Sequence, residues 1–157
     1  NNAGVSLIRV IQDTTPADWD NIFGVNVKGV YHCCRAVADK MIGCGGGSII
    51  NIASIWGEVG ASCEAAYSAS KGAVIAFTKA LAKELAPSKV RVNCVSPGVI
   101  DTGMNSHLTD TEMEQLIDSI PAGRIGYPED VAKACLYLAE ADYVTGEVLS
   151  VGGGFAK

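Results

Sequence analysis

The sequence predicts an α/β protein with a parallel sheet and helices on both faces of that sheet. Short apolar runs alternate along the chain with longer patterns of helical period, an order typical of strand–helix–strand units. The 157 residues are 48% hydrophobic, which is enough for one domain with a substantial core. We identify three strands, which is few for a doubly wound sheet.

The N-terminal part of the chain predicts one long helix and one strand. Thr15-Pro16-Ala17-Asp18 is typical of a helix start, with a threonine N-cap, a proline at the first helical position and an acid in the first turn. The helical pattern runs from Trp19 to Met41 and ends in the glycine-rich stretch 43–47. Ser48 to Ala53 is an almost continuous apolar run, as in a strand buried on both faces. The glycine-rich stretch follows a helix and precedes a strand, so we interpret it as a connector. A phosphate-binding loop has the opposite order.

The rest of the chain predicts three helices and two strands. Thr109-x-x-Glu112 forms a capping box for a short helix that ends near Ser119. The other predicted elements are a helix over Ala65–Ala86, a strand over Val90–Val95, a helix over Pro128–Ala139 and a strand over Gly146–Val151. Sites in parallel sheets lie at the carboxyl ends of the strands, so we expect the chemistry at those ends.

The charge balance argues against several classes of partner. Lys and Arg total 12 and Asp and Glu total 17, giving a net charge of −5, which disfavours a nucleic acid or an anionic membrane as partner. We find no apolar run of the roughly 18 residues that a membrane span needs, and no secretory signal pattern. These features predict a cytoplasmic protein.

The six cysteines match no zinc pattern and no CxxC redox motif. We expect them to be reduced and buried as small hydrophobic side chains. His32, Cys33 and Cys34 are adjacent on a predicted helix and therefore point in different directions, so they cannot close on one ion. We predict no metal site.

Three side chains form the candidate catalytic group. Tyr67 and Lys71 are four residues apart on one predicted helix and share a face, while Ser54 leaves the end of the preceding strand. A fixed ammonium group about 4 Å away would lower the pKa of a phenol from about 10 toward neutrality. The phenol could then act as a general acid or base, with Ser54 holding the same substrate oxygen. The alternative is that Tyr-x-x-x-Lys is a chance surface pair, which is common in helices. Only the combination of this pair with Ser54 and further motifs argues against that alternative.

Five motifs in order along the chain resemble the classical short-chain dehydrogenase/reductase family, within it the bacterial 3-oxoacyl-[acyl-carrier-protein] reductase type. They are Asn1-Asn2-Ala3-Gly4, Asn26-Val27-Lys28-Gly29, Ser54 with Tyr67-Ser68-Ala69-Ser70-Lys71, Pro97-Gly98-Val99-Ile100-Asp101-Thr102, and Gly123-Arg124-Ile125-Gly126-Tyr127-Pro128-Glu129-Asp130-Val131-Ala132. The resemblance implies the C-terminal part of a Rossmann-like, doubly wound parallel sheet, formed by residues 1–157 as a single domain.

The same resemblance implies a role for each catalytic residue. Tyr67 is similar to the acid/base of the family, Lys71 would lower the Tyr67 pKa and hold the nicotinamide ribose, and Ser54 would orient the substrate carbonyl. Asn26 would bend its helix and hold a water that links Lys71 to solvent. A solvated polar residue is the alternative interpretation of Asn26.

The implied cofactor is NADP or NAD, with NADPH favoured by the likeness. Asn1, Ala3 and Gly4 would lie against its adenosine side, and Tyr67 and Lys71 would also contact it. The loop after the second strand would hold the nicotinamide carboxamide through Pro97, Gly98, Ile100 and Thr102. The segment from Met104 to Gly123 corresponds to the mobile substrate lid of the family, in which His107 is a candidate substrate contact.

The expected function is reduction of a carbonyl to a secondary alcohol. The resemblance implies a 3-oxoacyl thioester as the substrate and a homotetramer as the assembly.

The family's glycine-rich phosphate turn is absent, so we expect the chain to be a C-terminal fragment lacking roughly 80–90 preceding residues. Such a fragment would bind dinucleotide weakly and expose a sheet edge. Gly152 stands where the family usually has an aspartate, and the chain between Leu138 and Tyr143 is slightly shorter than is usual in the family. Both features lie near the C-terminal end, which in the family contributes to subunit contacts, so they bear on the expected homotetramer. The alternatives are a non-catalytic scaffold that keeps the fold and, disfavoured by the short C-terminal end, a sugar-nucleotide epimerase or dehydratase relative.

Overall fold

The structure, a computed structural model, describes residues 1–105 and 108–155. Its centre is a three-stranded parallel sheet in the order β1 (Gly47–Ile52), β2 (Val90–Pro97) and β3 (Val148–Val151). Gly47 lies opposite Val90, and Cys94 lies opposite Val148. His107, the candidate lid contact, falls outside the described residues.

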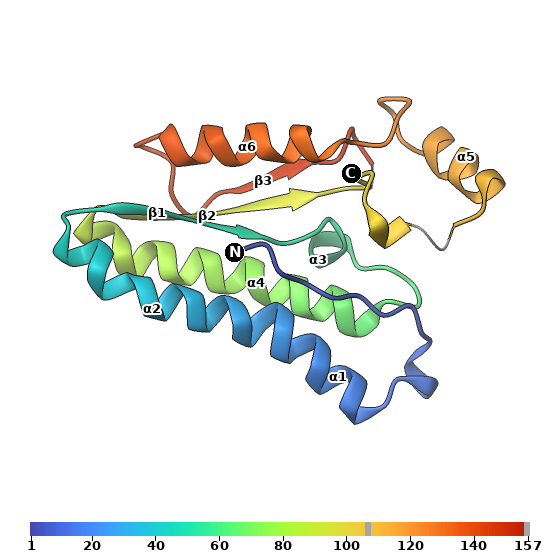
Figure 1. Cartoon of the computed structure of the whole chain (residues 1–157), viewed down its shortest axis with the longest axis horizontal. Coiled ribbons are helices and arrows are strands. Elements are labelled where there is room, and N and C mark those ends of the chain that lie inside the picture. The colour runs from blue at the N-terminus through green and yellow to red at the C-terminus, as the bar shows by residue number, and fades with distance from the viewer. Residues whose placement is uncertain (106–107, 156–157) are drawn as a thin grey trace.

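Helices cover both faces of the sheet (Figure 1). On one face lie α2 (Gly29–Gly43) and α4 (Ala65–Leu85), and on the other lies α6 (Pro128–Glu140). The predicted α/β class with helices on both faces is therefore confirmed. The burial of β2 explains its composition, because Val90, Val92 and Cys94 are fully enclosed against α4.

Local capping fixes where the helices begin. The helix α1 (Pro16–Phe23) starts as predicted: the backbone N–H of Asp18 donates to the Thr15 hydroxyl at 3.2 Å, and the Thr15 N–H donates to the Asp18 carboxylate at 3.0 Å. Thr109 and Glu112 make the same reciprocal pair at the start of α5 (Asp110–Asp118). Both capping boxes satisfy backbone donors that a helix start leaves unpaired.

The predicted continuous helix over Trp19–Met41 is interrupted. Between α1 and α2 the chain widens into a π-helical turn, η2 (Gly24–Lys28), with Asn26 at its middle. The periodicity of the sequence did not predict this turn, because one wider turn keeps the helical direction and hardly changes the spacing of apolar residues. Such turns within α-helices are frequent at functional positions.

Four short elements also lie outside the prediction. They are η1 (Ile11–Asp13), α3 (Trp56–Val59), η3 (Ala86–Ser88) and η4 (Gly103–Asn105). Each is too short to produce a helical period in the sequence. The last strand is two residues shorter than predicted, because Gly146 has a left-handed φ of 77° and turns the chain just before Val148.

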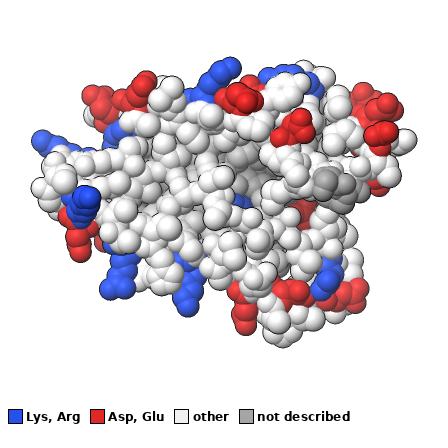
Figure 2. Space-filling view, in the orientation of Figure 1, with Lys and Arg blue, Asp and Glu red and all other residues white. Residues whose placement is uncertain are grey.

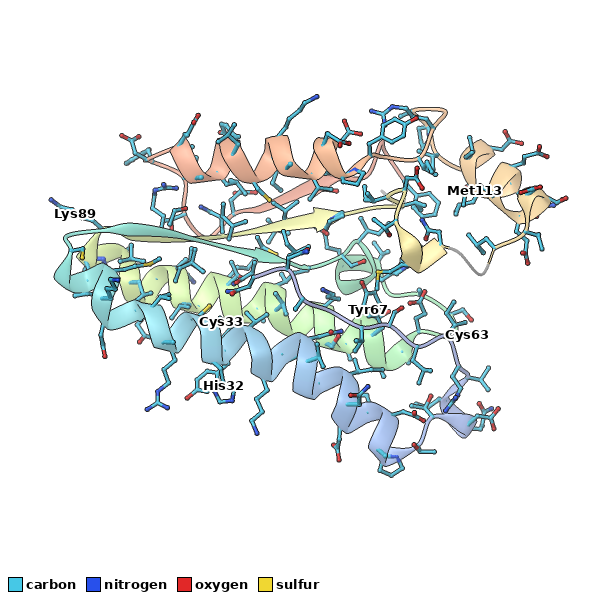
Figure 3. All side chains as sticks on the ribbon, in the orientation of Figure 1. His32, Cys33, Cys63, Tyr67, Lys89 and Met113 are labelled. Atoms are coloured by element: carbon cyan, nitrogen blue, oxygen red, sulfur yellow. The ribbon has the colours of Figure 1, made fainter. Side chains whose placement is uncertain are left out.

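The cysteine prediction is correct in one respect and wrong in another. All six cysteines are free, but only Cys34 and Cys94 are buried, whereas Cys33, Cys44 and Cys63 are exposed. Cys33 lies on the solvent side of α2, and the side chain of His32 projects away from the sheet (Figure 3). Over the described ranges, no cluster of three or more His, Cys, Asp or Glu residues could hold a metal ion.

Apolar residues of α4 belong mainly to the core. Val74 is buried in the hydrophobic core, and Phe77 and Leu81 are partly buried and pack against that core.

Within residues 1–105 and 108–155, none of the helices combines the length and hydropathy of a membrane span.

The outer edge of β1 is paired at its carboxyl end. The amino group of Asn1 donates to the Ile50 carbonyl at 2.8 Å, and the Ile52 N–H donates to the Asn1 carbonyl at 3.0 Å. This is the hydrogen-bond pattern of a parallel bridge. The first residue of the chain is thereby fixed at the end of the sheet where the strands leave for the site.

One acidic group at the start of α6 predicts an acid-sensitive contribution to stability. Asp130 accepts from the Tyr127 N–H at 2.9 Å and pairs with the Arg124 guanidinium at 2.8 Å. The hydrogen bond from Arg124 is the main cause that lowers the pKa of Asp130 to about 2. A depressed carboxyl pKa stabilises the fold above the unfolded-state pKa near 3.9, and this stabilisation is lost as pH falls toward 2.

We therefore expect Asp130→Asn to lower thermal stability at pH 7, with the difference from the parent protein shrinking between pH 4 and pH 2. Thermal unfolding followed by circular dichroism at several pH values would measure it. The control is Asp39→Asn, which neutralises an exposed carboxylate on α2. A deficit that stays constant down to pH 2 would contradict the assignment.

Candidate active site

A cleft of about 850 Å³ opens at the carboxyl ends of β1 and β2, where the parallel sheet predicts a site. Figure 2 shows this face hollowed near its middle, with most charged side chains toward the periphery. The residues that line the cleft include nine of the predicted site residues: Asn1, Gly4, Ser54, Tyr67, Lys71, Pro97, Gly98, Ile100 and Thr102. Of the other two, Ala3 is exposed and does not line the cleft, and Asn26 is buried behind it.

Ser54 is positioned by the turn that follows β1. Its hydroxyl oxygen accepts from the Trp56 backbone N–H at 3.2 Å, which ties the side chain to the first residue of α3. Ser54 lines the same cleft as Tyr67, and its hydroxyl acts on the phenol so as to lower the Tyr67 pKa. The predicted meeting of the strand end with the helix start is thus present in the structure.

Tyr67 and Lys71 lie one helical turn apart on α4, and both are buried. Figure 3 shows Tyr67 on the side of α4 toward the strand ends and α3. The Lys71 ammonium donates to the Ile52 carbonyl at 2.9 Å and lies 5.7 Å from the centre of the Tyr67 ring. The ammonium is therefore anchored to the last residue of β1, beside the phenol.

The predicted lowering of the Tyr67 pKa is wrong for this structure. Burial raises the pKa of Tyr67, the Ser54 hydroxyl lowers it in part, and the nearby Glu64 carboxylate raises it. Burial also lowers the pKa of Lys71. The spacing of the two residues predicts an ammonium about 4 Å from the phenol but carries no information on the cost of burying two ionisable groups, a cost that favours the neutral form of each.

A close backbone contact brings the strand end and α4 together. A Cβ atom built on Gly57 would lie 2.6 Å from the carbonyl carbon of Lys71 and 2.8 Å from the nitrogen of Gly72. Any side chain at residue 57 would therefore push α3 away from α4. Because Ser54 leads directly into α3, this contact sets the separation of Ser54 from Tyr67.

Asn26 is 1% exposed, which excludes the alternative that it is a solvated polar residue. Its carboxamide forms a pair with Val5, accepting from the Val5 N–H at 2.8 Å and donating to the Val5 carbonyl at 2.9 Å. It also donates to the Ser70 hydroxyl at 3.0 Å. Both N–H donors of the side chain are thus used within the protein. The carboxamide fastens the N-terminal segment to α4, between Tyr67 and Lys71.

The loop after β2 is shaped by a second close contact. A Cβ atom on Gly98 would lie 2.7 Å from the Cα of Gly152, so the glycine is required by the close approach of β3. We predicted a tight turn at Pro97-Gly98, but Pro97 still belongs to β2. Ile100 pairs with Gly126 in a parallel bridge, which holds the loop over the cleft. Thr102 is exposed at its rim.

Several residues that build the site were missed from the sequence. Asn1 donates to the side chain of Asn51 at 2.8 Å, and Asn51 donates to Thr78 at 2.9 Å, so a partly buried chain of hydrogen bonds joins the first residue to α4. Asn51 stands within an apolar strand, where a buried amide needs a partner. That placement is the signal by which the chain could have been found. Trp56, which lines the cleft, gave no comparable signal.

Known proteins share this sequence and architecture. A family model described as enoyl-(acyl carrier protein) reductase matches residues 1–156. The chain is 41% identical over 158 residues to the 3-oxoacyl-[acyl-carrier-protein] reductase FabG of Chlamydia trachomatis, covering 99% of this chain and 64% of that protein. The chain thus spans about 64% of the length of this curated relative.

Two solved structures agree closely in fold. The crystal structure of 3-oxoacyl-[acyl-carrier protein] reductase from Brucella melitensis matches with a TM-score of 0.95 at 33% identity, over 100% of this chain and 62% of that one. The structure of ElxO with NADP bound matches with a TM-score of 0.93 at 33% identity, over 99% of this chain and 65% of that one.

The contact of Gly57 with α4 predicts a local and measurable effect. We expect Gly57→Ala to lower the free energy of unfolding by about 1–3 kcal/mol, because the added methyl would overlap the Lys71–Gly72 backbone. Urea unfolding would measure this loss. The matched control is Gly43→Ala at the end of α2, where an added Cβ meets nothing within 4 Å. Equal effects of the two substitutions would show that the close contact is not what matters.

Proposed function

We propose a function for the whole protein from the premise that the chain belongs to the short-chain dehydrogenase/reductase family. The resemblance predicted from the five motifs is thereby confirmed at the level of the family. The proposed reaction is reduction of a carbonyl to a secondary alcohol, with NAD(P)H as the hydride donor. The observation that carries it is the joint placement of Ser54, Tyr67 and Lys71 on one cleft. Because the chain spans 64% of the FabG relative, the activity is assigned to the whole protein.

The proposed substrate is a 3-oxoacyl thioester. The name of the Chlamydia trachomatis relative supports this class. The lining of the cleft supports it as well, since Met104, Leu108 and Leu116 offer an apolar surface beside the polar group at Ser54. An acyl chain next to a reactive carbonyl has the same division into an apolar part and a polar part.

The residues present fit the nicotinamide end of a dinucleotide. At Gly4, a Cβ atom would lie 3.4 Å from both the Asn26 carboxamide oxygen and the Lys71 nitrogen, so a side chain there would crowd the lysine. Lys71 and Thr102 supply donors to the cleft, and Asn1 and Gly4, which also line it, are the residues against which the adenosine side would lie. When bound, the cofactor would supply the hydride. NADPH is our preferred form, in line with the NADP in the ElxO structure.

In the proposed mechanism Tyr67 is the proton donor to the substrate oxygen. Its burial keeps the phenol protonated at neutral pH, which is the form that an acid requires. Ser54 donates a hydrogen bond to the same oxygen and holds it at the phenol. As the hydride adds to the carbonyl carbon, the O–H bond of Tyr67 breaks and the alcohol O–H forms.

Lys71 and Asn26 support the phenol from behind. The ammonium of Lys71 favours the phenolate that remains after proton transfer, and its anchor at the Ile52 carbonyl fixes its place. Asn26 acts as a positioning residue, because its carboxamide joins the Val5 segment to Ser70 of α4. The water that links Lys71 to solvent stays a proposal. The Asn26 carboxamide oxygen accepts a hydrogen bond from the Val5 N–H, and the second acceptor position of that oxygen is the one at which such a water would bind.

The remaining proposals concern assembly and compartment. Exposed apolar side chains on α2, among them Tyr31, Val37 and Ile42, are compatible with a homotetramer built through this helix.

The six free cysteines, three of them exposed, favour a reducing compartment such as the cytoplasm. The scaffold alternative is disfavoured because Ser54, Tyr67 and Lys71 converge on one cleft.

Removal of the phenol hydroxyl tests the function directly. We expect Tyr67→Phe in the full-length protein to lower kcat by about 10²–10⁴-fold, because the proton donor is lost while the ring still packs. Turnover of NADPH with an acetoacetyl thioester, followed by absorbance, would measure it. Tyr143→Phe is the control, because Tyr143 is 100% exposed. Undiminished turnover in Tyr67→Phe would remove Tyr67 from its role.

The effect of Ser54 on Tyr67 predicts a shift in the pH profile. The Ser54 hydroxyl lowers the Tyr67 pKa, so we expect Ser54→Ala to raise that pKa further. Alcohol oxidation requires the phenolate, so its rate rises with pH, and we expect this rise to move to higher pH in Ser54→Ala. The pH dependence of kcat/KM would show the shift, with Ser119→Ala on the exposed end of α5 as the control. A lower rate with an unmoved pH profile would contradict the assignment.

A further inference from the structure

An aromatic pair joins the C-terminal part of the chain to the wall of the cleft. The ring of Phe155 meets the ring of Trp56 edge-on, with centroids 5.6 Å apart and planes at 67°. Both side chains are half-buried. Trp56 lines the cleft and lies two residues after Ser54. The pair therefore joins the C-terminal part of the chain to a residue that lines the cleft and is bonded to Ser54 through its backbone.

A glycine turn places Phe155 against Trp56. Gly153 and Gly154 have φ values of 61° and 87°, a left-handed conformation that side chains rarely adopt, and the chain reverses there after β3. The Phe155 N–H closes the turn by donating to the Gly152 carbonyl at 2.9 Å. The Ala122 N–H donates to the Gly153 carbonyl at 2.9 Å, so the turn is also fixed to the segment that follows α5. Phe155 is thus held from two directions.

Trp56 contacts the catalytic group through its backbone and is also part of the cleft lining. Its N–H donates to the Ser54 hydroxyl oxygen, and that bond needs no indole. Trp56 lines the same cleft as Met104, Leu108 and Leu116. A change of the Trp56 side chain can therefore alter the wall of the cleft and leave the tie to Ser54 in place.

We propose that Trp56, braced by Phe155, is a specificity-determining residue: its indole is the wall against which the apolar substituent of the substrate carbonyl packs. The inference rests on the proposed function, since it assumes a carbonyl held at Ser54. A rigid aromatic surface favours long or bulky apolar substituents over a methyl group, because each further methylene that it covers leaves water. Phe155 contributes by fixing the orientation of the indole.

The test is a series of 3-oxoacyl thioesters of N-acetylcysteamine with acyl chains of four, six and eight carbons, used with the full-length protein. We expect kcat/KM of the parent protein to rise by about fourfold for each methylene packed on the indole. Trp56→Ala should flatten this dependence, with a loss above tenfold for the longest chain and below threefold for the shortest. Trp56→Phe should restore part of the slope, and Phe155→Leu should give an intermediate slope.

Trp19→Phe is the matched control, because Trp19 lies on α1 and stacks with Phe23. Residues 1–157 contain two tryptophans, so in this variant Trp56 is the remaining indole of this part of the protein. Titration of that variant with the eight-carbon 3-hydroxyacyl thioester should change its emission, and Phe155→Leu in the same background should weaken the response. The same titration of Trp19→Phe/Trp56→Phe gives the background from any indole elsewhere in the full-length protein. This readout needs no turnover.

The outcomes separate the two proposals. A parent protein that reduces none of the thioesters overturns the proposed function, while the fluorescence titration still decides whether Trp56 faces a bound apolar chain. An active parent protein whose chain-length dependence is unchanged in Trp56→Ala overturns the specificity role alone. An equal loss for all three chain lengths also overturns it, because it would show that Trp56 only supports the fold around Ser54.

Discussion

The site depends first on how closely two backbones approach. Gly57 lies against the Lys71–Gly72 backbone so closely that a methyl group would overlap it. Through this contact the turn after β1 packs directly on α4, and a serine from a strand end reaches a tyrosine on a helix. The hydrogen bond from the Trp56 N–H then fixes the Ser54 hydroxyl within a geometry that the backbone has already set, and that hydroxyl lowers the Tyr67 pKa. Backbone packing determines which side chains meet, and side-chain chemistry determines what they do.

Burial has a cost that shapes the chemistry of the cleft. Tyr67 and Lys71 are both removed from water, and in each the neutral form gains from this. The fold compensates with fixed partners: the Ile52 carbonyl for the ammonium and the Ser54 hydroxyl for the phenol. A phenol that is neutral at rest, with an ammonium group anchored near its ring, is suited to a proton transfer in which negative charge on the phenol appears only briefly.

Much of the fold and most of the cleft could be predicted from the sequence. Capping residues such as Thr15 and Thr109 act locally, so their patterns indicate helix starts correctly. The Tyr67–Lys71 spacing fixes a shared helix face for the same reason. The pKa of Tyr67 could not be predicted, because it depends on burial by residues distant in sequence. The partners of Asn26 could not be predicted either, since Val5 and Ser70 are brought to it only by the fold.

The π-helical turn also acts on the phase of its helix. Buried side chains recur at every fourth residue across it, at Ile22, Asn26, Val30 and Cys34. A uniform α-helix advances about 100° per residue, so a repeat of four would drift by about 40° each time and by about 120° over the three steps. The wider turn at Gly24–Lys28 takes up part of this excess and keeps all four positions toward the interior. Deletion of one residue from that turn would bring Ile22 and Val30 to seven residues apart, close to two regular α-helical turns, so α1 and α2 would keep their phase while the wide turn that carries Asn26 would be lost.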